Sequence, residues 1–181
     1  MTPPGRRASE VTVPAADAAT SVAARLLAAL EHRGWTLAVA ESLTGGAVCA
    51  RLVDVLGASR VLRGGVVAYA TDLKAALLGV DDQLLAVRGA VDPDVAAAMA
   101  AGVRERLGAD LGLATTGVAG PDPQDGRAPG TVHVAVATSA GTRVASSRIA
   151  GDRVAVRAAT VQGVLELALA AVGEQEATPP R

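Results

Sequence analysis

The stretch TLAVAESLTGGAVCARLVDVLG, residues 36–57, decides the fold class of this chain. Its first part, TLAVAES, is a short apolar run typical of a buried strand. Its second part, GGAVCARLVDVLG, has apolar residues at helical spacing, and a strand that leads directly into a helix is the building unit of α/β domains. The residues expected to share the buried face of this helix are Val48, Leu52, Val55 and Leu56.

The same alternation continues along the chain. Further helices are expected over residues 18–34, 72–79, 92–108 and 152–173, and further strands over 64–70, 109–117, 131–139 and 142–150. The last two strands are joined by a short turn and are predicted to form a hairpin. Alternation followed by a hairpin predicts an α/β fold, a three-layer α/β/α sandwich with a mixed β-sheet. We expect one domain over 17–173, with flexible tails at 1–16 and 174–181.

Composition excludes several classes of protein. Among 181 residues there is no Phe, one Trp and one Tyr, so an aromatic platform for single-stranded nucleic acid is not expected. The net charge of −1 provides no electrostatic footprint for duplex binding. The lone Cys49, a start without a signal-peptide h-region and the lack of an apolar run near membrane-spanning length predict a cytoplasmic protein with no membrane partner.

Three junctions between strand and loop carry polar residues that a core does not require, namely residues 40–46, 68–74 and 115–123. In open α/β sheets the ligand crevice lies outside the carboxyl ends of the strands, so we expect the three junctions to meet there.

At the first junction, AESLTGG, Thr44 is a candidate helix cap and Gly45 and Gly46 leave the opening N–H groups uncovered. Such groups bind a phosphate or the oxyanion of an acyl-transfer intermediate. Ser42 stands just before them, at the place of a nucleophile. The alternative is that Ser42 and Thr44 are only helix-capping hydroxyls.

The second junction holds the only lysine of the chain, Lys74, beside sixteen arginines. Thr71 is the expected N-cap, which places Lys74 in the first helical turn, where the helix dipole and partial burial lower the pKa of an ammonium. Arginine cannot release its proton, so a retained lysine favours proton transfer. The alternative is a lysine that survives by chance.

At the third junction, Thr115 and Thr116 precede a glycine-rich turn through which backbone approaches a ligand closely; the alternative is an ordinary connection. No GxxxxGK[ST] motif is present, which excludes a P-loop. His32 and His133 stand alone, so no metal site is expected and a Ser–His pair is poorly supported. The remaining combination of nucleophile and base is Ser–Lys.

Together these segments resemble the CinA C-terminal domain family, the stand-alone nicotinamide-nucleotide amidases. The resemblance runs over about residues 20–172 and rests on AESLTGGAVCARLVDVLGAS, GGVVAYATDLKAALLGV, TTGVAGPD, PGTVHVAVAT and GDRVAVRAATVQGVLELAL. It implies an α/β/α fold and hydrolysis of the carboxamide of nicotinamide mononucleotide to nicotinate mononucleotide and ammonia. It also implies no metal or other cofactor, and self-association into a homo-oligomer.

The resemblance assigns roles by position. Ser42 matches the family serine of A-E-S-x-T-G-G, the expected nucleophile, while Tyr69 and Lys74 match the Y-x-x-x-x-K segment. Thr116 matches the hydroxyl residue before G-[IV]-A-G-P, and Arg153 matches the arginine of G-D-R. Lys74 would take the proton of Ser42 directly or through the hydroxyl of Tyr69, and both routes remain open.

Substrate contacts follow from the same resemblance. The N–H groups of Gly45 and Gly46 are the candidate oxyanion donors, and the phosphate would be held by Arg153 or by the turn from Gly117 to Gly120. The family usually reads Y-S-N-E-x-K, whereas this chain has Ala, Thr and Asp at positions 70–72.

Two other functions fit the same residues. The domain would bind a nucleotide without turnover, as a sensor or partner-docking module linked to competence or DNA damage, or it would hydrolyse a different carboxamide.

Overall fold

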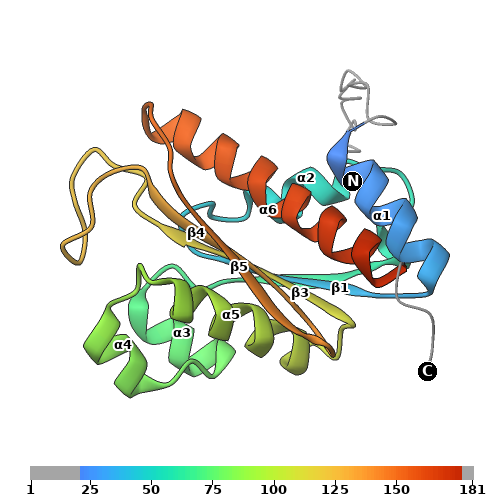
Figure 1. Cartoon of the computed structure of the whole chain (residues 1–181), viewed down its shortest axis with the longest axis horizontal. Helices are drawn as coiled ribbons and strands as arrows, with labels where there is room; N and C mark the ends of the chain where they lie inside the picture. The colour runs from blue at the N-terminus through green and yellow to red at the C-terminus, as the bar shows by residue number, and fades with distance from the viewer. Residues whose placement is uncertain (1–20, 177–181) are drawn as a thin grey trace, which may run out of the picture.

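The structure is a computed structural model that describes residues 21–176, so the tail predicted over 1–16 lies outside the described residues. One five-stranded sheet lies between two layers of helices (Figure 1). The strands are β1 (Leu37–Glu41), β2 (Leu62–Val67), β3 (Leu111–Gly117), β4 (Thr131–Thr138) and β5 (Gly141–Arg148). The helices are α1 (Val22–Arg33), α2 (Ala47–Val53), α3 (Thr71–Leu78), α4 (Asp82–Arg88), α5 (Pro93–Arg106) and α6 (Arg153–Glu176), with a 3₁₀ turn at Ala58–Arg60.

The sheet has the order β2-β1-β3-β4-β5. Strand β1 pairs in parallel with both β2 and β3, whereas β4 is antiparallel to β3 and to β5, with which it forms the predicted hairpin. The predicted α/β fold with a mixed sheet is therefore confirmed. Glu41 at the end of β1 is in register with Val67 on one side and Thr115 on the other, so three carboxyl ends lie at one level.

Two hydrophobic cores cover the two faces of the sheet. Alternation along β1 sends Leu37 and Val39 into the core under α1, α2 and α6, and sends Ala38 and Ala40 into the core under α3, α4 and α5. The second core contains many alanines, and it permits close approach of α5. A Cβ at Gly102 would lie 1.9 Å from a backbone oxygen of α3, so only glycine fits there.

The helices differ from the prediction in three respects, which are two helix ends and one helix that was not predicted. Helix α2 ends at Val53 rather than continuing to residue 57, and Leu56 is consequently 97% exposed instead of sharing the buried face. Helix α4 was not predicted, because its seven residues are too few for periodicity to be evident. Helix α6 continues to Glu176, into the segment predicted as the C-terminal tail.

Helix α6 corrects the expectation that no apolar run approaches membrane-spanning length. By length and composition alone, its 22-residue segment Arg153–Glu174 is apolar enough to cross a membrane. Val156, Val164, Leu165 and Ala168, however, are buried in the core beneath α6. Helix α6 packs on the sheet and on α1, and its apolar residues include exposed positions such as Val154 as well as these core positions.

Candidate active site

Ser42 and Lys74 lie in contact at the carboxyl ends of β1 and β2. Lys74 is the fourth residue of α3, and its side chain is buried, with 1% of the residue exposed. Its Nζ lies 3.1 Å from Oγ of Ser42 and donates to the backbone oxygens of Ala68 at 2.9 Å and Tyr69 at 3.5 Å. The structure thus brings the serine and the lysine of two separate motifs together.

The protein destabilises the charged form of Lys74. Burial lowers the pKa of Lys74 to about 8, and the negative charges of Asp125 and Asp72 act against this shift without cancelling it. Among the described residues, no carboxylate lies within ion-pair distance of Nζ. Thr71 is the first residue of α3 rather than its N-cap, which is Ala70, so the predicted Thr71 cap is wrong.

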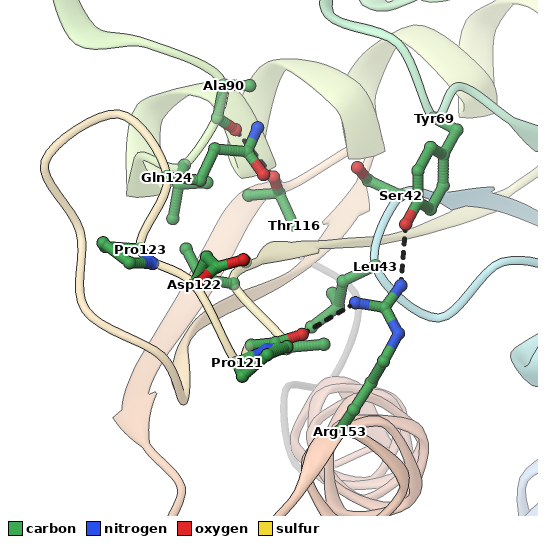
Figure 2. Close-up of a pocket in the computed structure, with 15 residues that line it drawn as sticks. Ser42, Leu43, Tyr69, Ala90, Thr116, Pro121, Asp122, Pro123, Gln124 and Arg153 are labelled. Atoms are coloured by element: carbon green, nitrogen blue, oxygen red, sulfur yellow. Dashed lines mark hydrogen bonds between the residues drawn. The ribbon is translucent and has the colours of Figure 1, made fainter.

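Tyr69 and Arg153 line the same site as Ser42 and contact each other. Arg153, the first residue of α6, donates from Nη2 to the Tyr69 hydroxyl at 2.8 Å and from Nη1 to the Gly120 oxygen at 3.0 Å (Figure 2). The Tyr69 hydroxyl is therefore engaged by Arg153, while Lys74 reaches Ser42 without an intermediary. In this geometry the Tyr69 hydroxyl does not lie between Lys74 and Ser42.

Thr116 and Gly117, at the end of β3, line a pocket of about 420 Å³. Thr116 lines this pocket and donates from Oγ1 to the Ala90 oxygen at 2.6 Å, which fixes the segment between α4 and α5 (Figure 2). On its other side the N–H of Ala90 donates to Asp125 at 3.0 Å. The remaining pocket residues are Ser42, Leu43, Tyr69, Val91, Arg153 and residues 117–124, which include the predicted Gly117 and Gly120.

The predicted oxyanion donors are not available. The N–H of Gly45 donates to the Ser42 oxygen at 3.1 Å, and the N–H of Gly46 donates to the carboxylate of Glu41 at 2.9 Å. Glu41 also accepts from Val48 at 3.1 Å and Cys49 at 2.9 Å. Its strand is covered on both faces, so this fully buried carboxylate needs protein donors, and it takes those of the α2 N-terminus.

Thr44 is likewise not the helix cap that the sequence predicts. Its side chain is fully buried, and Oγ1 lies 2.8 Å from Oγ1 of Thr115 on the neighbouring strand. Gly46, with φ of 96°, takes the N-cap position of α2. Within residues 21–176, the N–H groups of Leu43 and Thr44 form no hydrogen bond with protein. Of these two residues only Leu43 lines the pocket beside Ser42, so its N–H replaces those of Gly45 and Gly46 as the candidate oxyanion donor.

Two residues that sequence reasoning missed hold this loop. Glu41 closes the helix end, and Arg157 of α6 donates to the oxygens of Leu43 at 3.1 Å and Thr44 at 2.5 Å. The sequence feature that could have identified Glu41 is a carboxylate inside a strand predicted to be buried. The feature that could have identified Arg157 is its position one helical turn after Arg153.

The positions that depart from the family pattern lie outside the pocket. Ala70, Thr71 and Asp72 are exposed at the start of α3, and none of them lines the cavity. His133 lies in β4, where Nδ1 is 2.7 Å from Oγ of Ser146, so it is a packed strand residue rather than a partner of Ser42. Within the described range, no group of three or more His, Cys, Asp or Glu side chains is placed to hold a metal ion.

Fold and site together define an α/β domain with a buried Ser–Lys pair at the carboxyl ends of parallel strands. The chain belongs to the CinA C-terminal domain family, whose model matches residues 19–172.

Similar proteins support this assignment. A CinA-like protein of Frankia casuarinae is 56% identical over 142 residues, which are 78% of this chain and 33% of that protein. A CinA-like protein of Geobacter sulfurreducens is 49% identical over 136 residues, 75% of this chain and 33% of its own length. The chain thus spans about a third of the length of these curated relatives.

Solved structures agree with the fold. The competence/damage inducible protein CihA of Agrobacterium tumefaciens has a TM-score of 0.81 at 32% identity, covering 90% of this chain and 99% of that chain. The competence or damage-inducible protein of Enterobacter asburiae has a TM-score of 0.81 at 30% identity, covering 84% of this chain and 99% of that chain.

Proposed function

We propose that this chain is an amidohydrolase that converts nicotinamide mononucleotide and water into nicotinate mononucleotide and ammonia. The observation that carries the proposal is the buried contact of 3.1 Å between Nζ of Lys74 and Oγ of Ser42. A serine hydroxyl needs an adjacent base to become a nucleophile, and an amine with a lowered pKa is such a base.

The surroundings of Lys74 suit a neutral amine. A neutral amine has two N–H groups and one lone pair, and the backbone oxygens of Ala68 and Tyr69 accept the two N–H groups. The lone pair is then free to accept the proton of Ser42. An ammonium at the same place would present its third N–H to Ser42 and leave the hydroxyl without a base.

The reaction proceeds in two acyl-transfer steps. Lys74 accepts the proton of Ser42 while Oγ attacks the carboxamide carbon, and the N–H group of Leu43 stabilises the resulting oxyanion. Collapse of the tetrahedral intermediate breaks the C–N bond, and the Lys74 ammonium returns a proton to the departing ammonia. Water then attacks the Ser42 ester with Lys74 as base, which releases the carboxylate and restores the serine.

The pocket of about 420 Å³ with Arg153 among its lining residues supports a mononucleotide as the substrate. Arg153 uses two guanidinium N–H groups on Tyr69 and Gly120, and a guanidinium has five. The others remain for a phosphate at the rim. Because the departures at positions 70–72 lie outside the pocket lining, they do not argue against the family's substrate.

Ammonia release tests the proposal. The protein is incubated with nicotinamide mononucleotide, the riboside, nicotinamide and unrelated amides, with Ser42→Ala as the matched variant. We expect ammonia and nicotinate mononucleotide from the wild type, and no turnover from a folded Ser42→Ala protein. Thermal stabilisation by the nucleotide without ammonia would contradict the proposal and favour a nucleotide sensor. Turnover of another amide alone would contradict the substrate assignment.

A further inference from the structure

Arg157 contacts the nucleophile loop from the side of α6. The loop, residues 42–46, connects β1 to α2, and Arg157 donates to two consecutive carbonyl oxygens in it, those of Leu43 and Thr44. Among the described residues, Arg157 and Lys74 are the two basic side chains that contact this loop: Lys74 contacts the hydroxyl of Ser42, and Arg157 alone donates to backbone oxygens of the loop. The guanidinium also lies beside Gly45, where a Cβ would be 3.7 Å from Nη2.

The two bonds determine how the peptide planes of the loop are turned. In a planar trans peptide the C=O and the following N–H point in opposite directions. With the Leu43 oxygen held by Arg157, the N–H of Thr44 points away from α6. With the Thr44 oxygen held by Arg157 and also by the N–H of Ala47 at 3.3 Å, the N–H of Gly45 is turned away as well, and it meets the Ser42 oxygen at 3.1 Å. One side chain thus contributes to the orientation of two peptides beside the nucleophile.

We propose that Arg157 is a positioning residue that holds the Ser42 loop in its reactive conformation. By fixing the Thr44 carbonyl it orients the Gly45 N–H toward the Ser42 oxygen, and this leaves the Leu43 N–H of the same Ser42–Leu43 peptide turned the opposite way, toward the developing oxyanion. This inference rests on the proposed function. Arg157 does not line the substrate pocket and touches no reacting atom, so it acts through the loop backbone alone. A loop free to rotate one peptide would present a carbonyl oxygen to the oxyanion and repel it.

The location of Arg157 allows a chemical test. Arg157 lines a separate cavity of about 360 Å³ between α2 and α6, together with Ala50, Arg51 and Ala158. Removal of the side chain enlarges this cavity, and guanidinium or ethylguanidinium added to the solution has access to the two carbonyl oxygens. Arg51 lines the same cavity but makes no hydrogen bond to the loop, so Arg51→Ala is the matched control.

The experiment compares turnover of nicotinamide mononucleotide by wild type, Arg157→Ala, Arg157→Lys and Arg51→Ala, with and without ethylguanidinium. We expect kcat of Arg157→Ala to fall about 10²-fold, near the effect of losing one oxyanion donor. We expect KM to change less than about threefold, because ground-state contacts in the pocket are kept. Ethylguanidinium restores part of kcat in this variant only, and Arg157→Lys, with one point charge, is intermediate.

A second readout needs no substrate. We expect slow hydrogen exchange at the Gly45 amide in the wild type, because its N–H donates to the Ser42 oxygen, and faster exchange in Arg157→Ala but not in Arg51→Ala. If the wild type turns over no amide, the proposed function fails, and the exchange rate still decides the role of Arg157. Wild-type kcat in Arg157→Ala, or unchanged Gly45 exchange in a folded variant, overturns the inference.

Discussion

Lys74 and Arg153 are the two basic side chains of the candidate site, and they differ in burial and in hydrogen-bond partners. Lys74 is 1% exposed and contacts only neutral oxygens, and burial lowers its pKa to about 8. Arg153 is exposed, and it ties the Tyr69 hydroxyl to Gly120 at the rim. Burial lowers the pKa of Lys74, whereas the guanidinium of Arg153 is exposed to water. The difference separates a residue for proton transfer from one for binding an anion.

Exchange of the cation type at position 74 is expected to have the largest effect. Lys74→Arg keeps the charge but cannot accept a proton, so its kcat should fall about 10²- to 10⁴-fold, as far as that of Lys74→Met. Turnover at saturating substrate, with folding checked by thermal melts, measures both variants. If Lys74→Arg kept substantial activity and Lys74→Met did not, Lys74 would act through its positive charge rather than as a base. The difference in role between Lys74 and Arg153 would then not hold.

Removal of the rim cation should affect binding of the phosphate. Arg153→Ala loses a charge-assisted contact of about 1.5–3 kcal/mol, which corresponds to roughly a 10- to 100-fold loss in kcat/KM for the nucleotide. The riboside, which has no phosphate, should lose much less. Equal losses on both substrates, measured side by side, would place the phosphate elsewhere in the pocket.

The same comparison predicts an effect on stability. The unfolded chain has an ordinary lysine pKa near 10.5 and the folded protein about 8, so the unfolded state binds more protons between these pH values. The free energy of unfolding therefore rises with pH from 8 to 10.5, and below pH 8 the buried lysine costs about 3 kcal/mol. Lys74→Met should raise Tm at pH 7, with a gain that shrinks above pH 8. A lower Tm for Lys74→Met at pH 7 contradicts a desolvated lysine.

Asp125 should produce the smallest effect. Its charge raises the pKa of Lys74 against burial, so Asp125→Asn lowers this pKa further and moves the acid limb of kcat/KM to lower pH by less than about one unit. The asparagine oxygen can still accept from the N–H of Ala90. Asp122→Asn, which changes a pocket residue that does not shift Lys74, is the control. Equal shifts in both variants would assign the effect to the general charge of the pocket.

Much of the fold was predictable because periodicity and glycine punctuation are local signals. The buried strand at residues 36–42 and the Asp92 cap of α5 followed by Pro93 are read directly from the chain. The end of α2 was not, since the residues after Val53 keep a helical apolar pattern although Leu56 faces solvent. Here tertiary packing, rather than the local pattern, decides where the helix stops.

In the candidate site, the residues of the Ser–Lys pair were predictable but the fate of the loop N–H groups was not. The contact between Ser42 and Lys74 follows from two adjacent strand ends. The donors at the start of α2, however, are taken by Glu41, and the loop carbonyls are held by Arg157 from a helix more than a hundred residues later. Such competition for hydrogen bonds depends on side chains that meet only in the folded chain.

The pKa of Lys74 is the most direct measure of the central claim, that this amine is the base for Ser42. Lys74 is the only lysine in the sequence, so protein labelled with [ε-¹³C]lysine has a single side-chain resonance to follow by NMR through a pH titration. The account predicts a midpoint at about 8. A midpoint near the ordinary value of 10.5 would show that burial does not lower the pKa of this amine, and it would contradict the assignment of Lys74 as the base.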